Sequence, residues 1–291
     1  MQERAIKAIT DIFQCSPQQI QDIHPLKKGM TNDSFTFTLD GKKYIIRTPG
    51  VGTDKLINRQ EEYAVYQTIS AVNLCDDIVH IDPDSGYKIS TFREDARECD
   101  PFNWDDVAAC IERLKAFHSL KLTVPHTFCP FERIAFYESL WEGQPSCYAD
   151  YEATKQGVLA MKDYLDACAP TFWLTHIDAV PDNFLFINDD KEIWLIDWEY
   201  SAMQDQHLDI AMFIVYAMYD RAQADRLIDL YFSAGCSGDV RKKIYAYVAI
   251  CGLLWSNWCE YKRQKGVELG VYALRQYEFA KAYTQIFKET T

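Results

Sequence analysis

The amino-acid sequence predicts an α+β protein with two lobes, a small N-terminal lobe with an antiparallel sheet and a mainly helical C-terminal lobe. Short stretches of alternating apolar and polar residues, separated by turn signals, fill much of roughly the first ninety positions. Apolar residues at helical spacing fill most of the chain after position 105. We therefore expect the 291 residues to divide into lobes 1–93 and 94–291.

The N-terminal lobe is expected to open with two helices and to continue mainly as strands. An amphipathic helix should cover 2–14, and Ser16 followed by Pro17 should start a short second helix. Asp40-Gly41 is a tight-turn pair between two alternating stretches, and one further helix is expected over 54–70. The strands have a two-residue apolar period and are expected over 35–39, 44–47, 78–81 and 87–92. Together these elements predict an antiparallel sheet of about five strands.

The C-terminal lobe is predicted to be helical around one central hairpin. Its helices show apolar residues at helical spacing and are expected over 105–118, 131–141, 157–169, about 222–233, 239–262 and 267–288. A further apolar helix starts near Asp209, whose carboxylate is expected to cap the free N–H groups there. His118 follows an apolar helix face, so we expect a buried structural residue there and not a ligand or base.

The composition indicates a folded protein that does not bind nucleic acid. Hydrophobic residues make up 48% of the chain and the formal charge is −13. Residues 96–291 hold 19 Lys/Arg and 29 Asp/Glu, which disfavours nucleic acid and suits a small cation, although a solvated surface explains most of this charge. The ten Cys form no C-x-x-C pair, and we see neither a signal peptide nor a membrane-spanning stretch. These features predict reduced thiols, no membrane insertion and a cytoplasmic location.

A cluster of acids and one amide around the central hairpin predicts phosphoryl transfer. His176-Ile177-Asp178 is followed by Asn183, an apolar run, a polar turn, and a second run that ends in Asp197. Transfer from Mg²⁺-ATP uses such a set, because one carboxylate orients and deprotonates the acceptor hydroxyl while an amide oxygen and a second carboxylate bind the metal. The motif from His176 to Asn183 is short and only suggestive when taken alone. The correctly spaced Asp197 after it strengthens the prediction of phosphoryl transfer.

Two groups in the N-terminal lobe could contact the phosphates. The first is a loop between strands, made of Gly29, Met30, Thr31 and Asn32. Its backbone N–H groups could cover phosphates, though most such loops are plain hairpins. The second is Arg47 at a strand end with Glu62 on the next helix, which is the order of the cation–acid pair that holds ATP phosphates. Alone, these two would be a surface Arg and a solvated Glu, and the acidic cluster favours the functional interpretation.

Aromatic residues near the C-terminus offer two interpretations. Trp255 and Trp258 lie three residues apart and so share one helix face. Two indoles on one face usually pack in a core. The alternative is a wall for a quaternary ammonium, held by cation–π attraction of ~0.5–2 kcal/mol per ring. Tyr200, Tyr272 and Tyr277 keep this alternative open.

These motifs closely resemble the choline/ethanolamine kinase family, a relative of the aminoglycoside phosphotransferases with the protein-kinase-like two-lobe fold. The matching stretches occur in the family's order and comprise 28–32, 46–50, 57–62, 176–183, 195–203 and the Trp255/Trp258 pair. The similarity covers about residues 26–280 and resembles in particular the bacterial choline kinases that supply phosphocholine to surface polysaccharide.

The resemblance implies a kinase that uses ATP and Mg²⁺ to convert choline to phosphocholine. It makes Asp178 the catalytic base and Asn183 and Asp197 the Mg²⁺ ligands. It places Arg47 and Glu62 as the pair at the phosphates, with the loop Gly29, Met30, Thr31 and Asn32 over the triphosphate. The ammonium cage would consist of Tyr200, Trp255 and Trp258 with Tyr272 or Tyr277.

Three departures from the family pattern concern the acceptor. Ile177 stands where Asn or Gly is usual, Val180 where some choline kinases have a polar residue, and Tyr216 where an acid could assist the cation. Ethanolamine, thiamine or an aminoglycoside therefore remain alternatives, and an inactive kinase-like binding module is disfavoured because the acids are present. The aromatic residues favour choline, whose nitrogen has no hydrogen to donate. The sequence predicts no particular oligomeric state.

Overall fold

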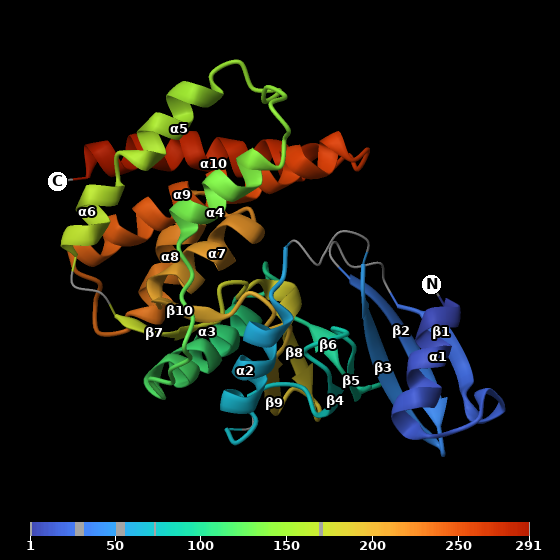
Figure 1. Ribbon diagram of the computed structural model, residues 1–291. Helices are drawn as coiled ribbons and strands as arrows, with labels where there is room; N and C mark the ends of the chain where they lie inside the picture. Colours follow the sequence, from blue (N-terminus) through green and yellow to red (C-terminus); the bar gives the residue numbers. More distant parts are fainter. Residues whose placement is uncertain (1, 27–31, 51–55, 73, 169–170, 291) are drawn as a thin grey trace. The chain divides into compact units, whose positions relative to one another are not determined.

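Figure 1 shows the computed structural model of the chain, which describes residues 2–26, 32–50, 56–72, 74–168 and 171–290. These residues form two compact units. Unit 1 contains the chain up to Cys99 together with Asp182–Ser201, and unit 2 contains Asp100–Pro181 together with the chain from Ala202 onward. The α+β class is confirmed, since an antiparallel sheet comes first and helices dominate the later part of the chain. The lobe boundary between 93 and 94 stays a prediction.

Unit 1 is built on a five-stranded antiparallel sheet in the order β1-β2-β3-β5-β4, which confirms the predicted sheet. Its strands are β1 (Gln21–Pro25), β2 (Asn32–Leu39), β3 (Lys42–Pro49), β4 (Ile78–Ile81) and β5 (Lys88–Thr91). Asp40 and Gly41 join β2 to β3 with φ of 50° and 73°, the left-handed conformation that a two-residue hairpin turn requires. Helix α1 (Gln2–Phe13) lies along this sheet and buries Ala5 and Ile9 in its core (Figure 1).

Two helices of unit 1 are shorter than the sequence patterns predict. The residues after Ser16 form a single 3₁₀ turn, η1 (Pro17–Gln19), closed by a 2.8 Å hydrogen bond from the Ser16 N–H to Gln19 Oε1. The helix predicted over 54–70 is α2 (Arg59–Ile69), and residues 51–55 lie outside the described part of the chain. Asn58 is extended, and its side chain accepts hydrogen bonds from the first turn of α2, so this cap fixes the helix start.

A second sheet in unit 1 contains the predicted central hairpin. Its strands are β6 (Arg97–Glu98), β8 (Phe184–Ile187) and β9 (Glu192–Leu195), in the order β6-β8-β9. The turn between β8 and β9 has three consecutive residues at φ of 53°, 54° and 64°, which are Asn188, Asp189 and Asp190. Asn and Asp tolerate this conformation better than other side chains. Arg97 binds the Asp190 carboxylate at 2.8 Å, so β6 is fixed to the hairpin turn.

Unit 2 is mainly helical, as predicted. Its helices are α3 (Trp104–Ser119), α4 (Pro130–Ser139), α5 (Tyr151–Leu159), α6 (Lys162–Ala167), α7 (His207–Tyr216), α8 (Arg221–Tyr231), α9 (Gly238–Gln264) and α10 (Gly270–Glu289). The single helix predicted over 157–169 is wrong, because the chain forms α5 and α6 with a break at Ala160 and Met161. Helix α5 starts earlier than expected because Tyr151 and Thr154 are buried. A search for regularly spaced apolar residues misses these two side chains because both carry a hydroxyl group.

One small sheet in unit 2 is absent from the sequence prediction. Strand β7 (Phe172–Thr175) pairs antiparallel with β10 (Ala202–Asp205), and Thr175 Oγ1 donates to the Gln204 carbonyl at 2.9 Å. The two strands are four residues each and come from segments more than twenty residues apart, so only the folded chain brings them together. Strand β7 leads directly into His176, and the pairing therefore fixes where the segment that contains His176 and Asp178 begins.

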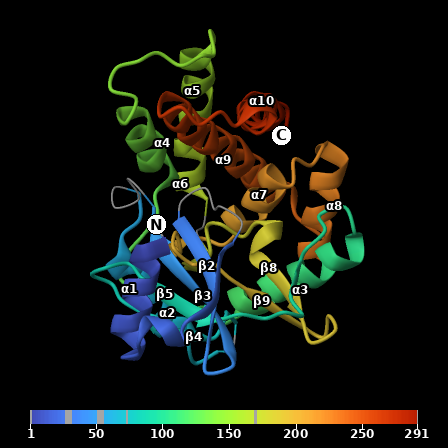
Figure 2. The same cartoon turned by 90° about the vertical axis from the view of Figure 1, so that its right-hand side faces the viewer.

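Helix α9 is the centre of unit 2. Its residues from Lys243 to Glu260 are all buried, and it runs beside α10 in both views (Figures 1 and 2). A Cβ at Gly252 would lie 2.7 Å from the Gln276 carbonyl oxygen, so only glycine lets the α9 and α10 backbones approach this closely. None of the helices in the described ranges combines the length and apolar character needed to cross a bilayer.

Candidate active site

Arg47 and Glu62 form a buried ion pair in unit 1. Arg47 on β3 and Glu62 on α2 are 5% and 2% exposed, and their charged atoms approach to 2.6 and 2.8 Å. Burial alone would raise the pKa of Glu62, but the charge and hydrogen bond of Arg47 bring it down to about 2. The structure thus joins the two residues that the sequence pairs. Their role toward phosphate stays a prediction.

Glu199 is a third charged member of this cluster, and the sequence motifs give it no role. Its Oε2 lies 3.4 Å from Arg47 Nη1 and 3.1 Å from Arg59 Nη1. Burial, and then the nearby Asp197 carboxylate, raise the pKa of Glu199 to about 7. The signal in the sequence that could identify it is an acid two residues after a predicted metal-binding Asp, next to a Trp.

Asn32 is the one member of the predicted phosphate loop that the structure describes, because Gly29, Met30 and Thr31 lie outside the described residues. Asn32 opens β2 and is 8% exposed. Its amide nitrogen donates to Glu199 Oε2 at 2.8 Å, and its amide oxygen accepts from Arg59 Nη2 at 2.8 Å. The side chain is therefore part of the buried charge cluster.

Asn183 and Asp197 lie at the two ends of the β8–β9 hairpin. Asn183 closes η3 (Pro181–Asn183), and its carbonyl accepts from the Ile196 N–H at 2.9 Å, which brings the two ends together. Asp197 follows β9 with φ of 65°, and Trp198 Nε1 donates to the Leu195 carbonyl at 2.7 Å and closes the turn. The Asp197 side chain is 39% exposed and lies 3.7 Å from Arg47 Nη1.

The donor set of this hairpin fits Mg²⁺ in its chemistry. Asn183 supplies an amide oxygen and Asp197 a carboxylate, and both are oxygen ligands of the kind that Mg²⁺ prefers. The described ranges contain no cluster of three His, Cys, Asp or Glu side chains that could hold a metal alone. This agrees with Mg²⁺ sites in which one or two protein ligands are completed by phosphate oxygens and water.

The segment that contains Asp178 is held by Asp209 in unit 2. Asp209 is fully buried, and its carboxylate accepts from the N–H of His176 at 3.0 Å and of Ile177 at 2.7 Å. Its Oδ2 also lies 3.0 Å from His118 Nε2, and the other ring nitrogen of His118 lies 2.8 Å from Tyr231 Oη. The prediction that Asp209 caps a helix is wrong in its main part, since the carboxylate binds the backbone of His176 and Ile177 and makes no cap hydrogen bond on α7. The prediction that His118 is a buried structural residue is confirmed.

Ile177 has a strained backbone. Its φ is 70°, a conformation that costs a β-branched residue on the order of 1–3 kcal/mol. Ile177 is also 2% exposed, so burial of its side chain and the bond of its N–H to Asp209 oppose the strain. Asn and Gly, which are usual in the family at this position, adopt a positive φ with little cost. A positive φ is the conformation in which Asn or Gly would be expected, and this chain adopts it with Ile177.

One aromatic side chain of unit 2, that of Tyr272, interacts electrostatically with Asp178. The pKa of the Tyr272 phenol is raised by burial first, with further contributions from Cys259 and the Asp178 carboxylate. The Tyr272 ring is 6.1 Å from that of Tyr216. The structure therefore places Tyr272 within electrostatic range of the predicted base and beside Tyr216.

Trp255 and Trp258 pack edge to face on α9, with ring centroids 5.8 Å apart and planes at 85°. They are 9% and 2% exposed, and Trp255 Nε1 contacts Met212 Sδ at 3.3 Å.

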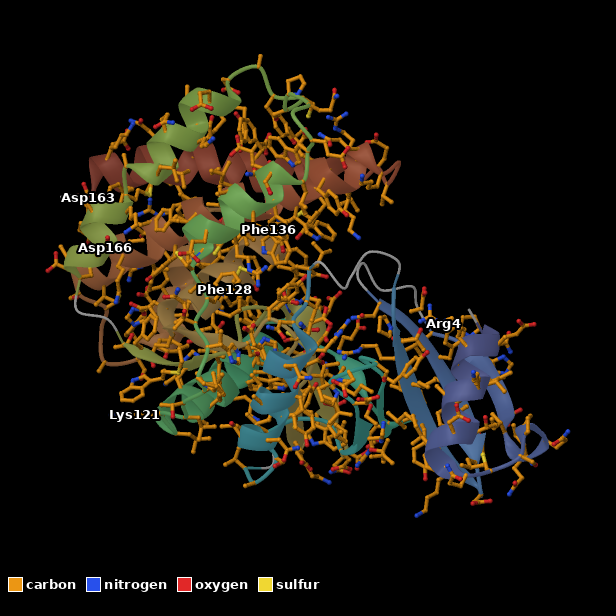
Figure 3. The ribbon with its side chains drawn as sticks, viewed as in Figure 1. Arg4, Lys121, Phe128, Phe136, Asp163 and Asp166 are labelled. Carbon is orange, nitrogen blue, oxygen red and sulfur yellow. The ribbon has the colours of Figure 1, made fainter. Side chains whose placement is uncertain are left out.

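The ammonium of Lys262 lies 5.1 Å from the Trp258 ring centroid, within cation–π range. Arg133 similarly lies within 6 Å of the rings of Phe128 and Phe136, which Figure 3 labels. Aromatic rings of this unit thus make cation–π contacts with side chains of the protein itself.

Of the two tyrosines left open by the sequence, Tyr277 is engaged elsewhere. Its ring stacks on Tyr148 at 3.8 Å, and its hydroxyl lies 2.7 Å from Asp150 Oδ1 and 2.9 Å from Thr154 Oγ1. These contacts fix Tyr277 against the start of α5, whereas Tyr272 lies near Asp178. Tyr200 is half-buried and belongs to unit 1, so its place in an ammonium cage stays a prediction.

Comparisons with known proteins agree with the motifs. The choline/ethanolamine kinase family model matches residues 23–228. Protein LicA of Haemophilus influenzae is 26% identical over 277 residues, which cover 87% of this chain and 77% of that protein. The structure of choline kinase LicA from Streptococcus pneumoniae is 26% identical, with a TM-score of 0.84 over 98% of this chain and 99% of that one.

The fold extends to a more distant group. The aminoglycoside phosphotransferase APH(4)-Ia is 14% identical, with a TM-score of 0.70 over 98% of this chain and 99% of that one, and it shares the fold alone. The family match spans 206 of the 291 residues, from 23 to 228, and includes the Asp178, Asn183 and Asp197 motif. The chain therefore belongs to the choline/ethanolamine kinase family.

Proposed function

We propose that this protein is a choline kinase that transfers the γ-phosphate of ATP to the hydroxyl of choline. The observation that carries the proposal is the neighbourhood of Asp178 in unit 2. Tyr272 interacts electrostatically with this carboxylate, and the Trp255–Trp258 pair belongs to the same unit. A base for the hydroxyl and rings for the ammonium are both needed by this reaction.

The nucleotide side of the proposal uses unit 1. Arg47, fixed by Glu62, would contact the phosphates, and Asn183 and Asp197 would hold Mg²⁺. LicA has been solved in complex with AMP, in a structure 27% identical to this chain, which supports a nucleotide as co-substrate. When bound, Mg²⁺ would neutralise charge on the phosphate oxygens.

Asp178 would orient the acceptor hydroxyl and take its proton as the oxygen attacks. Phosphoryl transfer passes through a loose transition state, so catalysis depends mainly on position and charge. Asp209 would contribute to position, because it holds the backbone just before Asp178 through two N–H groups. Glu62 would contribute by keeping Arg47 in place.

The acceptor is argued from the kind of side chains near Asp178. A quaternary ammonium has no hydrogen to donate, so ring faces suit it better than single acceptors do. Tyr216 stands where an acid could assist the cation, and its ring lies 6.1 Å from that of Tyr272. Ethanolamine, thiamine and aminoglycosides are the alternatives on the same fold, and a coupled assay with all four acceptors separates them. Turnover of none would favour the inactive binding module.

Replacing either indole should weaken choline binding. We expect Trp255→Ala and Trp258→Ala each to raise the choline KM by about 2- to 30-fold, since a cation–π contact contributes ~0.5–2 kcal/mol. The ATP KM should change by less than about twofold because no indole is assigned to the nucleotide. Steady-state kinetics with choline and ATP varied separately measure both values.

The matched control is Trp104→Ala. Trp104 also lies in unit 2 and carries a guanidinium over its ring, that of Arg226 at 4.0 Å, but belongs to α3. This variant should leave the choline KM unchanged. Equal choline KM values in wild type and both α9 variants, with melting temperatures reduced, would make the indoles core residues only.

A further inference from the structure

Arg59 connects three groups of the buried cluster in unit 1. Its side chain is 11% exposed, and Nη1 lies 2.7 Å from Glu62 Oε2 and 3.1 Å from Glu199 Oε2. Its other amino nitrogen, Nη2, donates to Asn32 Oδ1 at 2.8 Å. Asn32 in turn donates to Glu199 Oε2 at 2.8 Å, so Arg59, Asn32 and Glu199 form a closed ring of hydrogen bonds.

The charges of the cluster show what Arg59 does for Arg47. Two guanidinium groups face three carboxylates, those of Glu62, Glu199 and Asp197. Without Arg59, Arg47 alone would face all three, and its N–H groups would be drawn to them. In the structure Arg59 takes up part of this charge, because Glu199 Oε2 lies 3.1 Å from Arg59 Nη1 and 3.4 Å from Arg47 Nη1.

We propose that Arg59 is a positioning residue for the nucleoside triphosphate: it holds Asn32 and Glu199 in place and shares with Arg47 the negative charge of Glu62 and Glu199. This inference rests on the proposed function, because it assumes that Arg47 meets ATP. It assigns no contact with the reacting atoms to Arg59. Its effect should therefore appear in nucleotide affinity and not in binding of the amine.

The β4–β5 turn gives an independent way to displace Arg59. A Cβ at Gly86 would lie 3.0 Å from Arg59 Nε and 2.9 Å from Pro49 Cγ, closer than side chains pack. Gly86 also has φ of 72°, so alanine there adds backbone strain. Gly41 has φ of 73° in another hairpin of the same sheet, with no atom within 4 Å of a Cβ. Gly41→Ala is therefore a control for the strain without the displacement.

The test compares full-length Arg59→Gln, Arg59→Lys, Gly86→Ala and Gly41→Ala with wild type. We expect Arg59→Gln to raise the ATP KM about tenfold or more, as expected for loss of charge-assisted hydrogen bonds, while the amine KM stays within about twofold. Arg59→Lys keeps the charge but not the planar fork, so its ATP KM should be intermediate. Gly86→Ala should raise the ATP KM, and Gly41→Ala should not, at matched folded fractions by circular dichroism.

Calorimetric titration with Mg²⁺-ATP in the absence of any amine separates this inference from the proposed function. Weaker ATP binding in Arg59→Gln supports the inference even if wild type phosphorylates no amine, a result that would overturn the proposed function alone. Equal ATP affinity in wild type, Arg59→Gln and Gly86→Ala overturns the inference even if choline is turned over. An equal rise of the ATP and amine KM values also overturns it, since that pattern indicates general disorder.

Discussion

Asp178→Asn should lower kcat by about 10²–10⁴-fold, the usual contribution of a positioned general base. Asparagine keeps the size of the side chain but cannot take the proton of the acceptor hydroxyl. The fold should survive, because Asp178 is half-buried and the bonds to Asp209 come from the preceding backbone. The KM for ATP should stay near that of wild type. Single-turnover phosphoryl transfer, measured with saturating ATP and choline, reports the chemical step directly.

The control for this variant is Asp182→Asn. Asp182 lies four residues later in the same motif, but the sequence assigns it neither the base nor the metal. The variant makes the same change of one carboxylate to an amide, and it should reduce kcat by less than about threefold, because Asp182 has no assigned part in the reaction. If Asp178→Asn retained wild-type turnover, the assignment of the base would be lost, whatever the acceptor.

Asp209→Ala should destabilise the protein by about 3 kcal/mol or more. It leaves two backbone N–H groups and the His118 ring without their acceptor in a fully buried place, and each unsatisfied group costs about 1–3 kcal/mol. The same loss releases the segment before Asp178, where Ile177 holds a strained φ of 70°. Turnover per folded molecule should therefore also fall. Urea unfolding followed by circular dichroism measures the first effect, and kinetics at a temperature where the variant is folded measure the second.

Asp205→Ala is the comparison that separates the two effects. Asp205 is a second buried aspartate of unit 2, 3% exposed, which binds Lys243 Nζ at 2.7 Å and the His207 N–H at 3.0 Å. Its replacement should also destabilise the protein, because it leaves a buried ammonium unpaired. Turnover per folded molecule of this variant should remain near wild type. If both variants lost stability and kept full turnover, Asp209 would be structural only.

The sequence predicts the elements whose signals are local. Asp40-Gly41 specifies its turn through two positive φ values, and α9 shows the apolar spacing of a buried helix. The prediction is weaker where tertiary contacts decide. Helix α5 starts at Tyr151 because its aromatic ring and Thr154 are buried against other helices. Strands β7 and β10 are four residues each and pair only in the folded chain.

The residues of the candidate site likewise fall into two groups: those that the sequence predicts and those whose contacts only the structure shows. Asp178, Asn183 and Asp197 are recognised from spacing alone, because one strand–turn–strand segment fixes their separation along the chain. The sequence assigns Asp209 to a cap because it shows only that this residue begins a helix. Its partners His176 and His118 lie more than thirty residues away in the chain.

By itself, the sequence of this protein determined the α+β class and the family, and it predicted the residues of the reaction, since these are recognisable from short-range spacing. Only the tertiary structure decided how those residues are held. It added Glu199 and Arg59 to the Arg47–Glu62 pair, moved Asp209 from a cap to the catalytic segment, and separated Tyr272 from Tyr277. The physical reason is that buried polar groups must find partners, and those partners come from whichever distant segment packs beside them.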